Sequence, residues 1–206
     1  MELNKIILLH EDFLADFGFS LEQKQLRYSK SFGEGKQIIF FHHTHHQDAL
    51  YVEYQLGIRF DQVEAIIHKF LPTLGDYKDR SITLVETLDR INPEMPRRYF
   101  LKNDLEIRPV ISKVEEFLVK EGFRWLDKYT YGRQLEKFFN DDPDRNIATQ
   151  NFTYRSSRGI TLARLYNPHR YKAVKDLYLA RMEEMQVTPF TVACFLNLID
   201  FLDNMD

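Results

Sequence analysis

Histidines are the most unusual chemistry-bearing residues in this sequence. Four of the seven stand within five positions, His42-His43-Thr44-His45-His46. They follow the apolar run Ile38 to Phe41, so we expect them at the end of a strand. Alternate residues of a strand share a face, which places His43 and His45 together and the other two opposite them. Two imidazoles at this spacing can bind one zinc ion, each at about 2.0–2.1 Å.

A metal-dependent hydrolase that uses the His42–His46 cluster, with His43 and His45 as its first ligands, is therefore one hypothesis. The stretch resembles the H-x-H-x-D-H motif of hydrolases with the metallo-β-lactamase fold, but Gln47 stands in the place of the Asp. Catalytic zinc sites usually have three protein ligands, so a third would have to come from His68, His169 or a carboxylate. The alternative is a partly exposed strand end with polar aromatic side chains.

A second feature is the charge of residues 145–182. This segment contains eight basic residues and one acidic residue, Asp176, which leaves 20 basic and 30 acidic residues elsewhere. Aromatic residues alternate with the basic ones. The basic residues are Arg145, Arg155, Arg158, Arg164, Arg170, Lys172, Lys175 and Arg181, and the aromatic ones are Phe152, Tyr154, Tyr166, Tyr171 and Tyr178.

Three interpretations of this segment stay open. Basic grooves with stacking rings bind single-stranded nucleic acid, but the whole chain has a net charge of −3, and no nucleic-acid-binding motif accompanies the segment. The basic residues could instead pair with acidic residues of the same chain, or bind an acidic protein. For the last case the predicted partner-binding residues are Arg158, Arg164, Arg170, Tyr171 and Lys175.

Several classes of protein are excluded or disfavoured. The single cysteine, Cys194, excludes an intrachain disulfide and a multi-cysteine metal site. Glycine-rich phosphate loops and the G-x-S-x-G nucleophile motif are absent, so we expect no cofactor. The first residues do not resemble a signal peptide, and no apolar run approaches about 18 residues. We expect a cytoplasmic protein without a membrane partner.

The first half of the chain predicts a sheet with helices. Apolar residues recur at helical spacing up to Phe17, and Gly18 ends that helix. His10 lies on the apolar face, where we expect a hydrogen-bonded histidine at the edge of the core. Strands are predicted over 20–30, 36–46 and 51–60, then a helix over 61–74 ended by Gly75. Two further strands are predicted within 82–88 and 97–102.

The second half predicts helices. One covers about 107–122 and is closed by Gly122, and one or two cover 125–139. Residues 140–159 predict a polar, loop-rich stretch, and a helix over 168–185 follows. The last helix begins at Pro189 and is apolar almost all round, which is typical of a helix that is buried on most sides or covered by a partner.

The predicted fold class is α+β. An N-terminal helix and an antiparallel sheet of four to five strands with a packed helix precede a helical C-terminal half. The predicted division is 1–102 for the sheet with its helices and 103–206 for the helical subregion, fused in one globule.

Two stretches of the sequence resemble a family. They are Asp16-Phe17-Gly18-Phe19 leading to Tyr54-Gln55-Leu56-Gly57-Ile58, and Glu121 to Asp127 followed by Leu135. Over about residues 1–140 the chain resembles a bacterial domain family of unknown function that is discussed as immunity proteins of polymorphic toxin systems. The resemblance implies a binding protein and offers no catalytic residues.

The sequence therefore favours a non-enzymatic protein-binding module, and the resemblance implies one of the immunity type. Missing catalytic motifs, aromatic richness and segregated charge all point this way. We expect a protein partner, either an acidic protein or a second copy of the chain, rather than nucleic acid.

Overall fold

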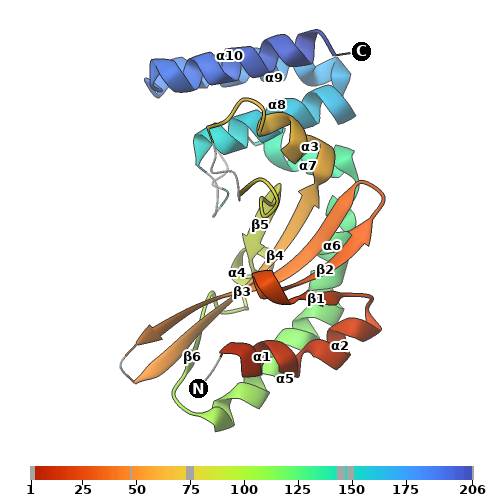
Figure 1. Ribbon diagram of the computed structural model, residues 1–206, viewed down its shortest axis with the longest axis vertical. Helices are drawn as coiled ribbons and strands as arrows, with labels where there is room; N and C mark the ends of the chain where they lie inside the picture. Colours follow the sequence, from red (N-terminus) through yellow and green to blue (C-terminus); the bar gives the residue numbers. More distant parts are fainter. Residues whose placement is uncertain (1–2, 47, 73–76, 143–146, 148–150, 206) are drawn as a thin grey trace. The chain divides into compact units, whose positions relative to one another are not determined.

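The computed structural model describes residues 3–46, 48–72, 77–142, 147 and 151–205. These residues form two compact units, each assembled from two stretches of chain (Figure 1). Unit 1 contains 1–59 and 84–130, and unit 2 contains 60–83 and 131–206. The boundary predicted at residue 102 is therefore wrong, because the helices up to residue 129 pack with the sheet and residues 60–83 pack with the later helices. Fusion of the two regions into one globule stays a prediction.

Unit 1 is built on an antiparallel sheet, which confirms the α+β class. The strands are β1 (Ser20–Glu22), β2 (Arg27–Phe32), β3 (Gly35–His46), β4 (Ala49–Phe60), β5 (Leu84–Thr87) and β6 (Tyr99–Leu101). Their order is β1-β2-β3-β4-β5, and β6 also pairs with β4. The described residues thus form six strands rather than four to five. The predicted strand 20–30 is divided by a 3-10 turn, Gln23–Gln25, and by Leu26, whose φ is +49°.

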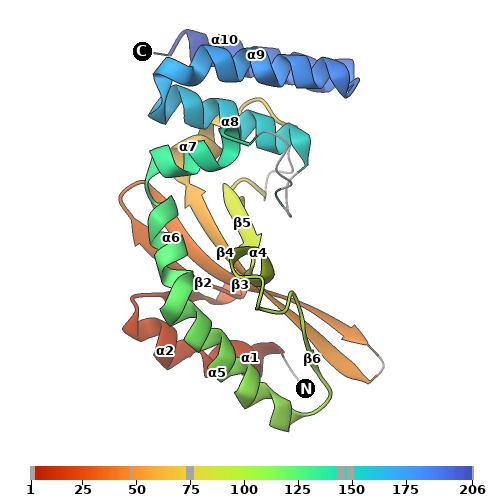
Figure 2. The same ribbon diagram turned by 180° about the vertical axis from the view of Figure 1, so that it is seen from behind.

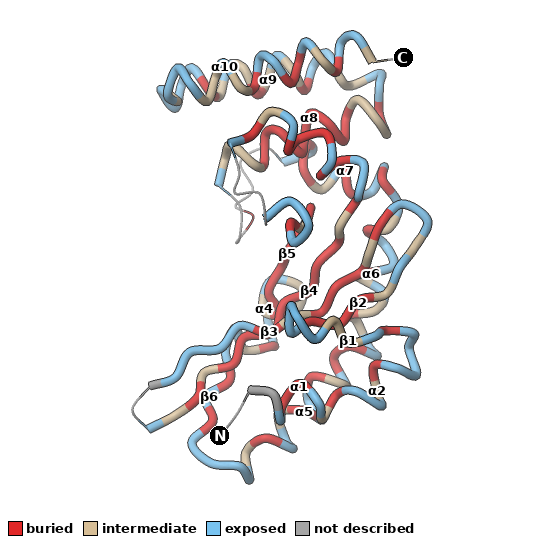
Figure 3. The backbone as a smooth tube through the Cα atoms, in the orientation of Figure 1, coloured by how far each residue is buried: buried red, intermediate tan, exposed pale blue. Residues whose placement is uncertain are grey.

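One face of the sheet carries the core of unit 1. In β4 the residues Val52, Tyr54, Leu56 and Ile58 are buried, as their alternation predicted. Figure 3 shows most of β4 as buried. The helices of this unit are α1 (Leu3–Leu9), α2 (Glu11–Asp16), α4 (Leu88–Ile91), α5 (Ile107–Phe117) and α6 (Phe123–Tyr129). Tyr28 donates to the carbonyl oxygen of Ile7 at 2.8 Å, which ties this face to α1.

Two glycines of unit 1 have different roles. Gly18 has φ +81° and follows α2, as the predicted helix cap requires. The expectation that Gly122 closes a helix is wrong, because Gly122 lies in a π-turn, Leu118–Gly122, that continues into α6. A Cβ atom at Gly122 would come within 2.8 Å of Leu118 Cδ2, so a larger residue would strain this turn.

Unit 2 consists of helices in its described part. They are α3 (Asp61–Ile67), α7 (Gly132–Asn140), α8 (Phe152–Tyr166), α9 (Pro168–Glu184) and α10 (Pro189–Asp203), and Figure 2 shows α8, α9 and α10 from behind. The predicted helix starts at Pro168 and Pro189 are confirmed. The loop-rich prediction for 140–159 is wrong from residue 152 onward, because Asn151 accepts from the Tyr154 N–H and caps α8.

The last helix differs from its prediction. In α10 one face is buried, with Phe195, Leu198, Ile199 and Leu202 in the core of unit 2. On the other face Phe190 is 63% exposed and Leu196 is 47% exposed, so the helix is not buried on most sides. Within the described residues, no helix has both the length and the apolar character needed to span a membrane.

Candidate functional site

The histidine cluster lies on a projecting hairpin of unit 1. β3 and β4 continue beyond β1, β2 and β5 as an arm, which we call the hairpin arm, residues 41–46 and 49–52, and β6 pairs with its β4 strand (Figures 1 and 2). Residues 42–45 are all exposed. The rings of His43 and His45 lie 5.6 Å apart between centroids, and His42 lies against Phe40 at 5.5 Å. The structure thus places His43 beside His45, as alternation along a strand predicts.

The metal hypothesis gains no third ligand from the structure. Among the described residues, no three His, Cys, Asp or Glu side chains are grouped so that they could hold a metal ion. His68 belongs to unit 2, where its Nε2 lies 3.4 Å from Glu64 Oε2. Use of His43 and His45 as ligands of a hydrolase therefore stays a prediction that no observation on the described chain favours.

A polar hollow opens at the base of the hairpin arm. It has a volume of about 300 Å³ and is lined by His42, His43, Thr44, Tyr51, Glu53, Gln55 and Arg98, which we call the hairpin hollow. Glu53 and Gln55 alternate along β4, and both are buried. The ring of Tyr51 packs on Phe100 of β6 at 4.8 Å between centroids. Two neighbouring strands and the segment that precedes β6 therefore build this hollow.

Glu53 is the electrostatic centre of the hairpin hollow. Its Oε2 accepts from Arg98 Nε at 2.9 Å and from Arg97 Nε at 3.4 Å, and its Oε1 accepts from Gln55 Nε2 at 2.5 Å. Burial raises the pKa of Glu53, but the hydrogen bonds from Arg98 and Gln55 outweigh burial, so this pKa lies below its ordinary value. The carboxylate is therefore ionised at neutral pH.

The charges around Glu53 do not cancel. One carboxylate faces two guanidinium groups, and the side chains of Arg97 and Arg98 are 57% and 60% exposed. The buried Oε1 of Gln55 has no hydrogen-bond partner among the described residues. The hollow thus offers cationic donors at its rim and one unsatisfied acceptor in its wall, a combination suited to binding an anionic group that also carries an N–H or O–H.

The basic residues predicted to bind a partner lie in α8 and α9 and have internal contacts. Arg164 donates to the carbonyl oxygens of Leu202, at 2.9 Å, and Met205. Arg170 pairs with Asp141. Tyr171 Oη donates to Asp203 Oδ1 at 2.8 Å, and Lys175 Nζ lies 3.0 Å from Asp203 Oδ2. Much of the basic charge of this segment is therefore matched by oxygens of unit 2 itself.

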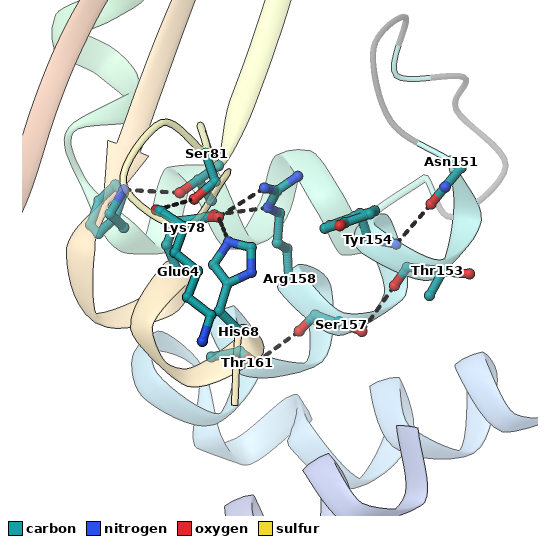
Figure 4. Close-up of polar contacts among 12 residues, drawn as sticks. Glu64, His68, Lys78, Ser81, Asn151, Thr153, Tyr154, Ser157, Arg158 and Thr161 are labelled. Carbon is teal, nitrogen blue, oxygen red and sulfur yellow. Dashed lines mark hydrogen bonds and ion pairs between the residues drawn. The ribbon is translucent and has the colours of Figure 1, made fainter. Parts of the chain in front are cut away.

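Arg158 does not lie at the surface, as the predicted partner-binding role requires. Its guanidinium forms a two-point ion pair with Glu64, with Nε to Oε1 and Nη2 to Oε2 both at 2.8 Å (Figure 4). The two side chains are 2% and 0% exposed. The ring of Tyr154 lies over the guanidinium at 5.3 Å. Arg158 therefore cannot present its charge to a partner while this pair is intact, and it is withdrawn from the predicted partner surface.

The aromatic rings of the same segment also have packing and hydrogen-bond partners within unit 2. Tyr178 is fully buried and donates to Asn140 Oδ1 at 2.9 Å, and Phe152 packs against it at 6.1 Å. Tyr166 packs on Phe60 at 5.5 Å. Tyr178 is not open to stacking on bases, and Phe152 and Tyr166 are partly covered by these contacts. Nucleic-acid binding through 145–182 therefore stays a prediction without structural support from the described part of that segment.

His10 occupies a buried hydrogen-bonded position, as expected. Its Nδ1 lies 2.9 Å from Glu115 Oε1 and its Nε2 lies 3.1 Å from Tyr54 Oη. The order carboxylate, imidazole, hydroxyl is that of a nucleophilic triad. However, burial raises the pKa of Tyr54, and this side chain is 1% exposed, so its hydroxyl is neither activated nor reachable. The three groups tie α5 and the junction of α1 and α2 to β4.

Comparison with protein families, with curated proteins and with solved structures found no match for this chain. The hairpin hollow therefore has to be interpreted from its own chemistry. Sequence reasoning missed Glu53, Gln55 and Arg98 as site residues. A signal was present, because Glu53 and Gln55 occupy alternate positions of the best-defined strand and two adjacent arginines precede β6.

Proposed function

We propose that this chain is a non-enzymatic protein-binding module, and that the free edge of β3 on the hairpin arm accepts an extended segment of its partner. One observation carries the proposal. β2 pairs with β3 only from Phe32 opposite Gly35 to Arg27 opposite Phe40, whereas β3 continues to His46. Within the described residues, β3 has only β2 and β4 as neighbours. Residues 41–46 therefore have one edge without a partner strand.

An open strand edge recruits extended peptides, because its main-chain N–H and C=O groups lack partners. Proteins that avoid such pairing place Lys or Pro on the edge. Residues 41–46 contain neither, and Thr44 and the aromatic side chains around it favour extended structure. The edge is thus compatible with addition of a strand.

The chemistry of the hairpin hollow favours an acidic segment. Arg97 and Arg98 expose guanidinium groups at the hairpin hollow, and Glu53 compensates only one of the two charges. The hollow extends to β3, where His42, His43 and Thr44 line it. A carboxylate of the added strand that extends over β3 into the hollow would meet Arg98, and a neighbouring donor would satisfy Gln55 Oε1. The resemblance of the sequence to immunity-type proteins, which implies a binding protein, agrees with this proposal.

The test uses two neighbouring proline substitutions, His43→Pro and Thr44→Pro, and a displayed library of random linear peptides as the probe. Adjacent residues of a strand direct their N–H groups to opposite edges, so one of the two prolines removes an N–H that faces β4 and the other removes one that faces the free edge. Enrichment of acidic peptides by the wild-type chain is expected. The edge-facing proline should abolish their binding and leave the melting temperature unchanged.

Two further variants identify the site. Arg98→Glu should weaken the selected peptides at least tenfold, whereas Arg133→Glu, at an exposed arginine of unit 2, should not. Failure to enrich any linear peptide, or binding that survives both prolines, would overturn the proposal. Enrichment of single-stranded oligonucleotides in place of peptides would overturn it as well.

A further inference from the structure

We infer that the exposed face of α10 joins two copies of this chain in a symmetric dimer, with the two α10 helices antiparallel. This inference does not rest on the proposed function, because it concerns unit 2 and a different surface. It starts from the exposed apolar side chains of α10. Figure 3 shows pale blue, exposed stretches along this helix.

The exposed face of α10 contains a protrusion at one end. Phe190 lies in the first turn and is 63% exposed, and Ala193 follows on the same side one turn later. Leu196, which is 47% exposed, flanks this side three residues after Ala193. The first turn of α10 contains no acidic residue. An aromatic ring that is left exposed in this way is typical of an interface residue.

The other end of the same face contains a hollow. It has a volume of about 640 Å³ and is lined by Phe70, Asn197, Asp200, Phe201, Asn204 and Met205, which we call the α10 hollow. Its walls are partly aromatic, since Phe70 packs on Phe201 at 5.4 Å. Positions 190, 193, 197, 200 and 204 repeat at intervals of three and four, so Phe190 and the α10 hollow lie on one side of the helix.

A protrusion and a hollow at opposite ends of one helix face are complementary to a second copy of themselves. In an antiparallel two-fold arrangement, Phe190 of each copy meets the α10 hollow of the other, and the axis passes near Leu196 and Asn197. Charge agrees with this arrangement. Asp200 of one copy lies near the first turn of the other α10, where the helix dipole favours a carboxylate.

The experiment is sedimentation velocity of the full chain over a concentration series. The wild-type protein should pass from monomer to dimer. Phe190→Ser should raise the dimer dissociation constant about 30-fold or more, because truncation of an apolar anchor has effects of this size. Leu196→Glu, at the flank of the interface, should raise it by a smaller factor. Leu105→Ser is the matched control, since Leu105 is 88% exposed in unit 1 and should leave the dissociation constant unchanged. Circular dichroism checks that each variant is folded.

A cross-link gives a second, independent measurement. Asn197→Cys in a Cys194→Ser background should form an intermolecular disulfide on mild oxidation, whereas Asp176→Cys in the same background, at an exposed position of α9, should not. A wild-type chain that stays monomeric over the whole series would overturn the inference. So would a dimer that persists in both Phe190→Ser and Leu196→Glu, or one that is lost in the β3 proline variants instead.

Discussion

Each unit of this protein contains a buried glutamate that pairs with arginine, and the two pairs differ in what surrounds the arginine. In unit 2, Glu64 and Arg158 are 0% and 2% exposed and meet through two hydrogen bonds of 2.8 Å. In unit 1, Glu53 is nearly as buried, but its partners Arg97 and Arg98 are more than half exposed. The same residue types thus form a closed pair in one unit and an open one in the other.

The difference agrees with a structural role for the closed pair and with the binding role proposed for the open one. In the closed pair both members are buried and hydrogen-bonded to each other, so we expect its removal to affect folding. The open pair exposes two guanidinium groups and leaves excess positive charge at the hairpin hollow. A buried glutamate is therefore uninformative about function until the exposure of its partner is known.

The largest loss of stability is expected when the closed pair is broken. Arg158→Met leaves the Glu64 carboxylate buried without its guanidinium and should lower the free energy of unfolding by about 3–5 kcal/mol. Arg98→Met, the matched change at the open pair, should cost less than about 1 kcal/mol, because exposed ion pairs contribute little. Urea unfolding followed by circular dichroism measures both.

A double variant makes this comparison stricter. Glu64→Gln combined with Arg158→Met removes the stranded charge and should recover part of the stability that Arg158→Met loses. Equal losses for Arg158→Met and Arg98→Met would show that the two pairs do not differ in the way their burial indicates.

The next effect concerns packing around the closed pair. A Cβ atom at Gly159 would lie 2.3 Å from Tyr178 Oη and 2.7 Å from Asn140 Oδ1, two atoms that are themselves hydrogen-bonded. Gly159→Ala should therefore lower the free energy of unfolding by about 2 kcal/mol. Gly33→Ala in unit 1 is the control, since no atom lies within 4 Å of its added Cβ, and it should stay within about 0.5 kcal/mol of the wild type. A neutral Gly159→Ala would contradict the close packing described here.

Local patterns in the sequence predicted much of this fold. The alternation over 51–60 is confirmed as β4, and the Asn-Pro and Thr-Pro pairs mark the starts of α9 and α10. These signals act between residues that are near in sequence, through side-chain direction along a strand and through the fixed φ of proline. Such local signals can therefore be recognised in a single amino-acid sequence.

Contacts between distant residues could not be predicted in the same way. Arg158 looked like one member of a basic surface, but its partner Glu64 lies 94 positions away, and no local pattern links the two. Glu53 and Gln55 occupy the polar face of β4, which a simple alternation assigns to solvent, and yet both are buried beside Arg98. Neither pair could be predicted from local sequence, because burial of a polar side chain depends on which remote segment covers it.

The smallest effect is a pH dependence that distinguishes the open pair from the closed one. Burial raises the pKa of Glu64, but the charge of Arg158 outweighs it and holds this pKa well below its ordinary value of 4.5. The pKa of Glu53 is also lowered from 4.5, against the effect of burial, by hydrogen bonds from Arg98 and Gln55. A lowered folded-state pKa stabilises the protein above the unfolded value, and this contribution is lost as the pH falls through the folded value.

Substitution of each glutamate by glutamine measures what its carboxylate contributes to the free energy of unfolding. At about pH 7, Glu53→Gln should cost roughly 1 kcal/mol or less, because its arginines remain hydrated, and Glu64→Gln should cost more, because Arg158 is then buried without a counter-charge. Urea unfolding at about pH 7 and about pH 3 measures the difference between each variant and the wild type. Both differences should shrink as the pH falls below about 4.5, because the unfolded wild-type chain then takes up the proton that the folded carboxylate does not. The difference left at about pH 3 should be larger for Glu64→Gln, because the pKa of Glu64 lies well below its ordinary value. A Glu53→Gln deficit that is the same at both pH values would contradict a lowered pKa of Glu53.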